Sequence, residues 1–435
     1  MSNEVNNVFL PKEQLLISKI LNPDILERIL GFLPVKEMLE ASLVCFNWHH
    51  IIGRSERCMS KLKVVYNQGY ERSRSRQITE DDDLKTMLDK SIRKYQNLKV
   101  STSDEKIVQL GLTHSRNIID IVGNSGREWK EIKVSGINFV DTKEYGSFLK
   151  AMAPNIRILY LRKVKIINSN DDYVVDVNFP KLVDADLLFC DPVMMSDTFE
   201  NCVNLRRFKF CNGAKLIPFP ESFRRILKMN ADLIIFEVTA QDVTHAIFNE
   251  KNYAMYACKL RSLSCSNFYS YVVPDFNESF IKFLRSQSKC LREITLTDAS
   301  DIETLEVLFN DMKVLEKASI THISQELKVN KFVAMKTNAN CPITTLTLSG
   351  YIPCQTDMLS KTMQACSNLE FLIADLLSER ALERVTTYCP KIRHMKYRSR
   401  YNYDFFKHRF FRSSSEIPES IFFTNEIEKY LSDYD

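Results

Sequence analysis

Cysteine and histidine are the residue types here that could perform chemistry, and their spacing favours structural roles. The chain has twelve cysteines and seven histidines among 435 residues. No two cysteines are separated by two residues, so zinc ribbons and redox dithiols lack local support. His49 and His50 are adjacent and cannot share one helical face. Cys45 and Cys58 lie near them, but a nucleophilic thiol also needs a positioned base and oxyanion donors, which the pattern does not supply.

Glycine-rich phosphate loops are also missing from the sequence. Ten glycines are present, with no G-x-x-x-x-G-K and no G-x-G-x-x-G pattern. The lone G-x-x-G at Gly123 and Gly126 has no specificity. We therefore predict no catalytic residue, no metal site and no cofactor.

The composition is that of an ordinary water-soluble chain. Apolar residues make up 45%, and no run approaches the roughly 18 apolar residues of a spanning helix. The net charge of +4 gives no support to nucleic-acid binding. The first residues lack a basic stretch followed by a long apolar one, so we expect no export, reduced thiols and a location in the cytoplasm and/or nucleus.

Residues 21–52 are expected to form three short amphipathic helices. Asn22 before Pro23 is a helix start, because the Asn side chain can accept from free amides and proline suits the first helical position. Gly31 is expected to end this helix, and Pro34 to start the next. So small a helical unit is marginally stable without a metal, disulfide or partner. It must therefore lean on another protein or on the rest of the chain.

The stretch LNPDILERILGFLPVKEMLEASLVCFNW (21–48) resembles an F-box, whose pattern is L-P-x-E-I-L…I-L…L-P…D-L-L…S-x-V-C-x-x-W. Asn22 replaces the usual proline and Asp24 the usual glutamate, which are slight departures. The resemblance implies docking onto the Skp-type adaptor of Skp–cullin–F-box (SCF) ubiquitin ligases and, through it, contact with cullin and RING subunits. A self-contained helical hairpin is the alternative. The adaptor-binding residues it implies are Leu21, Pro23, Ile25, Leu26, Ile29, Leu33, Pro34, Leu39, Val44 and Trp48.

An L-x-x-L-x-L-like core recurs after this stretch at steps of 23 to 31 residues. Each core alternates like a strand, and amphipathic stretches at 278–287, 302–311 and 378–387 read as helices between cores. Since a helix is about 10 Å wide and strands lie about 4.8 Å apart, stacking predicts a curved array with helices outside. The cores begin at Trp129, Ile156, Leu182, Leu205, Leu233, Leu260, Leu291, Leu315, Ile343, Leu369 and Ile392, with weaker versions at Met59 and Tyr95.

The array resembles leucine-rich repeats of the cysteine-containing kind found behind F-boxes. Six cysteines lie one to three residues before a core, where a small buried thiol packs well. The polar ladder residue expected eight positions after each core start is missing except at Cys190, so irregular turns are expected. The predicted fold class is α/β: a three-helix F-box followed by a leucine-rich-repeat horseshoe with a parallel sheet on its concave side.

The predicted domain organisation has five parts. They are an N-terminal extension (1–17), the F-box (18–57), irregular early repeats with a basic and acidic connecting segment (58–128), leucine-rich repeats (129–400) and an aromatic-rich cap or tail (401–435).

Target binding is expected on the open face of the sheet. In the cores beginning at 260, 291, 315 and 343, ten of the twelve open-face positions are Ser or Thr. More discriminating are the aromatic and basic positions near the two ends of the array, because such residues dominate binding energy. The predicted target-binding residues are Tyr160, Arg162, Arg207, Lys209, Phe371, Ile373, His394, Lys396 and Arg398.

Together these patterns predict a non-catalytic substrate-recognition subunit of an SCF ubiquitin ligase, with an unidentified protein as its target. One alternative is a scaffold whose F-box binds the adaptor without ubiquitin transfer. Another is an enzyme built on a repeat scaffold. We expect neither a membrane nor a nucleic acid among the partners.

Overall fold

The structure is a computed structural model, and it divides the chain into two compact units, Met1–Leu182 and Val183–Asp435. Among the residues described, no helix combines the length and apolar character of a membrane span. The residues that the structure describes are 22–68, 86–102, 115–124, 127–168, 175–195, 198–199, 201–216, 219–241, 243–248, 258–266, 278–297, 302–321, 341–349, 362–375, 379–398 and 422–424.

The described part of the first unit, from Asn22 onward, begins with four short helices. They are α2 (Pro23–Phe32), α3 (Val35–Ala41), α4 (Phe46–Arg54) and α5 (Glu56–Met59). Helix α2 starts as predicted, because the Asn22 side-chain oxygen accepts from the N–H of Asp24 at 2.9 Å. It does not stop at Gly31 but runs to Phe32. Pro34 sets the stop, since the residue before a proline disfavours helical angles, and Leu33 is extended at φ −63° and ψ 144°.

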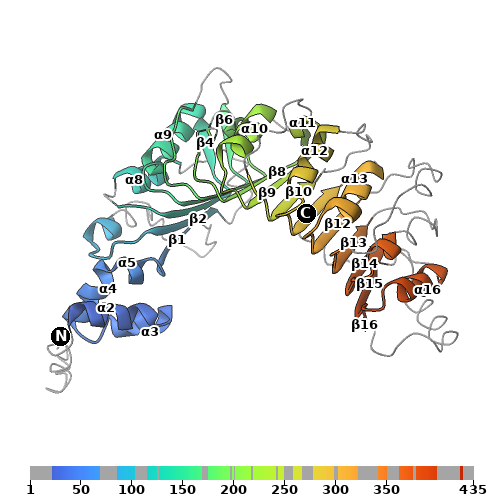
Figure 1. The fold of residues 1–435 in the computed structure, drawn as a ribbon. Helices are drawn as coiled ribbons and strands as arrows, with labels where there is room; N and C mark the ends of the chain where they lie inside the picture. Colours follow the sequence, from blue (N-terminus) through green and yellow to red (C-terminus); the bar gives the residue numbers. More distant parts are fainter. Residues whose placement is uncertain are drawn as a thin grey trace, which may run out of the picture. The chain divides into compact units, whose positions relative to one another are not determined.

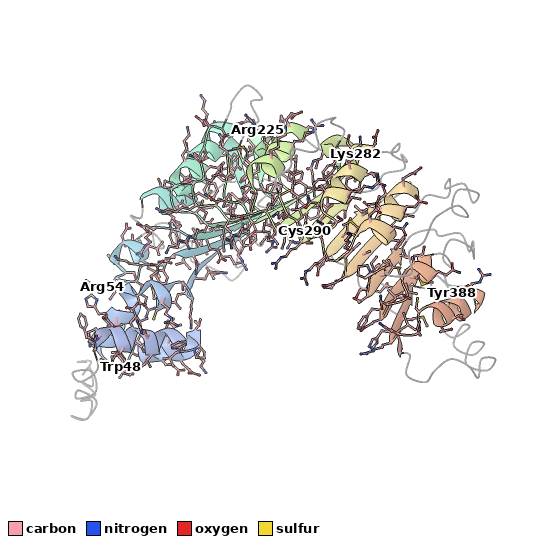
Figure 2. All side chains as sticks on the ribbon, viewed as in Figure 1. Trp48, Arg54, Arg225, Lys282, Cys290 and Tyr388 are labelled. Atoms are coloured by element: carbon pink, nitrogen blue, oxygen red, sulfur yellow. The ribbon has the colours of Figure 1, made fainter. Side chains whose placement is uncertain are left out.

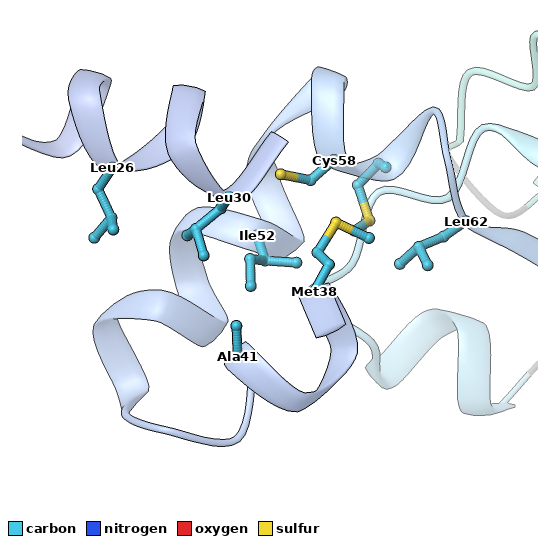
Figure 3. Close-up of a cluster of buried hydrophobic side chains, with 8 residues drawn as sticks. Leu26, Leu30, Met38, Ala41, Ile52, Cys58 and Leu62 are labelled. Carbon is cyan, nitrogen blue, oxygen red and sulfur yellow. The ribbon is translucent and has the colours of Figure 1, made fainter. Parts of the chain in front are cut away.

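One apolar cluster holds these helices together (Figure 3). Gly31 is buried at its edge, where an added Cβ would lie 2.6 Å from Cδ of Arg57. A side chain at this position would therefore have to displace the Arg57 side chain of α5. The buried members of the cluster are Leu26, Leu30, Met38, Ala41, Ile52, Cys58, Met59 and Leu62.

The helical cluster continues into the first strands instead of ending at a linker. Leu62, a member of the cluster, directly precedes strand β1 (Lys63–Gln68). Tyr95, before β2 (Asn97–Thr102), packs against the same cluster. Lys94 N–H donates to the carbonyl of Gly53 at 3.0 Å, and the Asn97 amide donates to the carbonyls of Ser60 and Leu62 at 2.6 and 3.1 Å. The helices are thus stabilised by packing against the first strands of their own unit.

The first unit carries a parallel sheet in the order β1, β2, β3 (Glu131–Ser135), β5 (Ile158–Arg162). A second, two-stranded sheet pairs β4 (Asn138–Asp141) with β6 (Lys165–Asn168). Helices α8 (Ser115–Asn124) and α9 (Thr142–Met152) lie on one side of the larger sheet (Figure 1). The weaker cores near Met59 and Tyr95 therefore belong to the same repeat system, because β1 and β2 extend the sheet of β3 in register.

The second unit continues this design with ten parallel strands in sequence order. The strands are β7 (Asp184–Leu188), β8 (Arg207–Leu216), β9 (Ile235–Gln241), β10 (Ser262–Ser266), β11 (Glu293–Thr297), β12 (Lys317–Thr321), β13 (Thr345–Ser349), β14 (Phe371–Asp375), β15 (His394–Arg398) and β16 (Phe422–Thr424). The helical segments are the 3₁₀ turn η1 (Pro192–Met195), α10 (Pro220–Met229), α11 (Val243–Phe248), α12 (Glu278–Ser286), α13 (Ile302–Glu306) with the π-helical turn η3 (Val307–Asp311), and α16 (Glu379–Tyr388).

Every predicted core from Trp129 onward contains a strand, which begins two residues after the predicted start. Within a strand such as β10, Leu263 and Cys265 are buried while Ser262, Ser264 and Ser266 face the open side. Buried side chains fill the layer between helices and sheet in each unit (Figure 2). The predicted fold is confirmed: a helical F-box-like unit precedes parallel strands and helices arranged as in a leucine-rich-repeat solenoid.

Two buried polar side chains, Asn230 and Gln287, join a repeat to the one before it. The buried Asn230 amide accepts from the N–H of Leu205 at 2.7 Å and donates to the carbonyl of Cys202 at 2.8 Å. The buried Gln287 accepts from the N–H of Leu260 at 3.0 Å. The ladder position expected from the sequence follows each strand, whereas Asn230 and Gln287 precede strands β9 and β11.

The cysteines near the cores pack as predicted, with one exception. Cys290 is only half-buried. Of residues 401–435 the structure describes strand β16 alone, which pairs with β15, so the proposed capping role of this segment stays a prediction. The buried members of the cysteine set are Cys202, Cys258, Cys341, Cys366 and Cys389.

Candidate functional site

Large apolar side chains are exposed over a short stretch of the helical cluster. Soluble proteins rarely leave contiguous apolar surface uncovered, and such surface often marks an interaction site. This stretch spans α2 and the start of α4. We call the following six residues, each more than 40% exposed, the apolar face: Ile25, Ile29, Phe32, Val35, Leu43 and Phe46.

Helical periodicity explains why α2 is apolar on two sides. Ile25, Ile29 and Phe32 recur at i, i+4 and i+7, so they form one stripe that faces solvent. Leu26 and Leu30 form the neighbouring stripe, which is buried in the helical cluster. The buried stripe therefore stabilises the helical cluster, and the exposed stripe is available for contact with a partner.

Local contacts hold the exposed aromatic residues of the apolar face in place. The guanidinium carbon of Arg57 lies 4.3 Å from the centroid of the Phe32 ring, a cation–π contact. At the start of α4, Cys45 accepts from the N–H of Trp48 at 3.5 Å. This capping contact fixes the first turn of α4, where the ring of Phe46 meets that of His50 edge-on at 5.3 Å.

Helix α2 is also anchored to α5 by a polar contact. The Ser55 hydroxyl donates to Oε1 of Glu27 at 2.6 Å and accepts from the N–H of Cys58 at 3.1 Å. Ser55 is buried, so both hydrogen bonds are partly shielded from water. The position of the exposed stripe of α2 is thus set from the opposite side of the helix.

The predicted adaptor-binding residues occupy three different environments. Leu21 lies outside the described residues. Leu26 is only 1% exposed, so it supports the apolar face from beneath and is not available for direct contact as predicted. Pro23, Ile25, Ile29 and Pro34 are exposed, whereas Leu33, Leu39, Val44 and Trp48 are half-buried.

Sequence reasoning missed four members of the apolar face. Phe32, Val35, Leu43 and Phe46 are exposed but were not among the predicted contacts. A usable signal existed for Phe32, since it continues the stripe of Ile25 and Ile29 one turn further. Trp48, labelled in Figure 2, is half-buried, and its indole nitrogen has no hydrogen-bond partner among the residues described.

The predicted target-binding residues of the first unit lie on the open face of the sheet. The Lys133 ammonium lies 4.2 Å from the centroid of the Tyr160 ring. Lys133 also pairs with Glu131 at 3.1 Å, and Lys63 pairs with the same carboxylate at 3.2 Å. Burial alone would raise the pKa of Glu131, but the hydrogen bonds and charges of these two lysines outweigh it and lower that pKa. Arg162 is exposed on the same sheet.

In the second unit the predicted basic residues are paired with acids. Arg207 lies 3.4 Å from Asp184 and 3.6 Å from Asp186, and Lys209 pairs with Glu237. Burial raises the pKa of Asp186 despite the neighbouring Arg207 and Lys209 charges. These cations therefore have carboxylate partners within the chain.

Near the other end of this sheet, an aromatic pair lies across two strands. The rings of Phe371 and His394 stack with centroids 4.9 Å apart and planes at 7°. Ile373 is half-buried on the same strand as Phe371. The strand positions of Lys396 and Arg398 are described, but their side chains lie outside the described residues.

Hydroxyl groups form a row between these charged and aromatic regions. Strand pairing aligns Ser264 with Thr295, Thr295 with Ser319, and Ser319 with Thr347. All four are half-buried. A hydroxyl both donates and accepts, so this row can meet polar groups of either kind.

Three of the buried thiols are poorly suited to nucleophilic chemistry. Burial raises the pKa of Cys202, Cys258 and Cys389 to about 12, so these thiols are protonated near neutral pH. Within the described ranges, no group of His, Cys, Asp and Glu side chains is arranged to hold a metal ion.

Comparison with known proteins identifies the helical cluster. Residues 19–59 match the F-box domain family. A search of curated proteins gave no match. Among solved structures, a leucine-rich-repeat protein of Leptospira interrogans is similar at 13% identity, over 68% of this chain and 89% of that chain, with a TM-score of 0.27.

Proposed function

Because the chain is an F-box protein with leucine-rich repeats, we propose that it is the substrate-recognition subunit of an SCF E3 ubiquitin ligase. F-box domains in general bind Skp-type adaptors. The observation that carries the proposal is the apolar face, which lies entirely within the matched residues 19–59. In this proposal the adaptor covers that face and links the chain to cullin and RING subunits, in the cytoplasm or the nucleus.

The energetics of the apolar face suit such a contact. Complete burial of one large apolar side chain contributes about 1.5–3 kcal/mol. Six partly exposed residues thus offer enough apolar surface for a stable complex, even after the cost of association. The helices are already held by their own cluster and by β1 and β2, so little ordering is required on binding.

The proposed role of the repeats is to hold a target protein on the open face of the sheet. No covalent step takes place on this chain in the proposal. The rate gain comes from effective concentration, because a target held near the ubiquitin donor reacts as if it were present at a high local concentration.

Adaptor capture by the purified full chain tests the proposal. We expect an immobilised Skp-type adaptor to capture the wild-type chain and not the Ile25→Ala/Ile29→Ala variant, whose circular dichroism should be unchanged because both side chains are exposed on α2. Val203→Ala is a matched control, since Val203 is an exposed aliphatic residue of the second unit. Equal capture of all three proteins would refute the assignment of the adaptor contact.

Ubiquitin transfer needs a separate measurement. Deleting the first 55 residues is unsuitable, because the helical cluster also contains Cys58, Met59 and Leu62. A reconstituted reaction with cullin, RING subunit and ubiquitin-charged enzyme is preferable, using targets captured by the full chain. Modification that is lost in the Ile25→Ala/Ile29→Ala variant supports a ligase subunit. Adaptor binding without modification would instead support a scaffold.

A further inference from the structure

The open face of the first unit's sheet carries an excess of positive charge. Its described charged residues are one carboxylate, Glu131, and four cations. Strand pairing puts Val65, Lys99, Lys133 and Tyr160 in one row across β1, β2, β3 and β5. Glu131 and Arg162 lie in the rows on either side of it. The four cations of this basic face are Lys63, Lys99, Lys133 and Arg162.

Two of these cations have no acidic partner among the residues that the structure describes. Glu131 already pairs with both Lys63 and Lys133. Lys99 and Arg162 are exposed, and neither has a carboxylate partner among the residues described. An exposed, uncompensated cation attracts anionic groups of a partner.

The second unit shows that this charge excess is not a general property of the repeats. On the open face of its sheet, Arg207 and Lys209 are paired with acids, as noted above. Lys317 pairs with Glu293 at 2.7 Å. Every lysine or arginine whose side chain is described on that face therefore has a carboxylate partner, unlike Lys99 and Arg162.

The spacing of the two free cations selects the kind of anion. Lys99 and Arg162 are two strands and two residues apart in register, which places their Cα atoms about 12 Å apart for strands about 4.8 Å apart with a rise of about 3.3 Å. Residues i and i+4 of an extended peptide are about 13 Å apart and point to the same side. Two separate carboxylates fit this spacing better than one phosphate group does.

The row that contains Lys99 also offers apolar contact. Tyr160 is half-buried beneath the Lys133 ammonium, and Val65 is exposed at the other end of the row. An aromatic ring beside cations favours a segment that carries an apolar residue between its acids. Nucleic acid fits less well, because its tight binding normally requires many phosphate contacts and this face has two free cations.

We propose that the basic face binds an extended acidic segment of the target protein, with Lys99 and Arg162 contacting carboxylates at positions i and i+4 and Tyr160 contacting an apolar residue between them. This inference rests on the proposed function in that the segment belongs to the target. It concerns residues outside the F-box, so the two can fail independently.

Fluorescence anisotropy with the full chain tests the inference. The probe is a labelled ten-residue peptide with Glu at positions 3 and 7 and Leu at position 5, and the reference peptide carries Gln at both acidic positions. We expect the Glu peptide to bind at least about tenfold more tightly in 50 mM salt, with the difference shrinking in 300 mM salt because exposed charges are screened. Equal affinities, or no binding of either peptide, would overturn the proposal.

Charge-reversal variants locate the binding site. Lys99→Glu/Arg162→Glu is expected to abolish the preference for the Glu peptide. Lys143→Glu/Lys150→Glu makes the same change in net charge on exposed positions of α9 and is expected to keep that preference. Equal losses in both variants would mean that bulk charge is responsible and would overturn the proposal.

Two further measurements separate the remaining outcomes. Tighter binding of a ten-nucleotide thymidine strand than of the Glu peptide would overturn the assignment to a protein segment. Capture by the Skp-type adaptor is measured on the same variants and is expected to be unchanged. If the wild-type chain is captured by the adaptor but shows no preference for the Glu peptide, this inference alone is contradicted. If the adaptor fails to capture the wild-type chain, the proposed function is contradicted.

Discussion

The double substitution Ile29→Ala/Phe32→Ala separates binding from folding in the F-box. Ile29 is 47% exposed and Phe32 is 73% exposed on the solvent stripe of α2. If complete burial of such side chains is worth about 1.5–3 kcal/mol, covering their exposed parts contributes about 1 and about 2 kcal/mol. The variant should therefore lose about 3 kcal/mol of adaptor binding. Since 1.4 kcal/mol corresponds to a factor of ten, this is an affinity loss of about 100-fold.

Folding should change little in the same variant. Truncating Phe32 removes the contact with Arg57, worth about 0.5–1 kcal/mol, but alanine is the better helix former. Leu30→Ala is the opposite case, because Leu30 is 1% exposed and its truncation leaves a cavity that costs about 2–5 kcal/mol of folding stability.

Isothermal titration of the purified adaptor into each full-length protein measures the affinity, and thermal unfolding followed by circular dichroism measures the fold. Val203→Ala/Met229→Ala serves as the control, since these residues are similarly exposed in the second unit. The reasoning is refuted if Ile29→Ala/Phe32→Ala binds within about threefold of wild type while remaining folded. It is also refuted if the control loses as much affinity.

Three further expectations concern the repeats. Asn230→Ala should cost about 2–3 kcal/mol of stability, because it leaves the buried N–H of Leu205 without its acceptor. Hydrogen exchange of β8 and β9 measures this loss, and unchanged exchange would contradict the role of Asn230. Asp186→Asn should gain stability relative to wild type as the pH rises from about 4 towards 7. A carboxyl with a raised pKa binds its proton more tightly in the folded state, so its ionisation opposes folding. Parallel pH profiles of thermal unfolding for the two proteins would count against this expectation. Iodoacetamide at pH 8 should leave Cys202, Cys258 and Cys389 unlabelled in the native protein and should label them after denaturation. Peptide mass spectra measure the labelling, and labelling of these thiols in the native protein would contradict the expectation.

The strands were predictable from the sequence because their signal is local and repeated. A core such as LREITL alternates buried and open positions, and β11 at Glu293–Thr297 follows that alternation. Repetition at a nearly constant step then fixes the parallel order, since within each unit the strand of one core pairs with the strand of the next core. Even the weaker core near Tyr95 forms a strand in register with its neighbour.

The candidate site was less predictable, because α2 is apolar on two adjoining stripes. The sequence cannot show which stripe packs inward, so Leu26 and Ile25 appeared equivalent, although Leu26 is buried and Ile25 is exposed. The contact of Arg57 with Phe32 depends on how α5 meets α2, which no local pattern reports. Charge balance on the open faces likewise depends on which residues of different strands become neighbours.

The shared core of the F-box helices and the first strands has a consequence for how a ligase subunit of this kind would work. Leu62, Tyr95 and the Lys94–Gly53 hydrogen bond join the helices directly to the segments that lead into β1 and β2. An adaptor seated on α2 would therefore point in one direction relative to the basic face, and a segment gripped there would always enter the ligase from the same side. The target lysines that receive ubiquitin would then be those at a fixed distance from that segment.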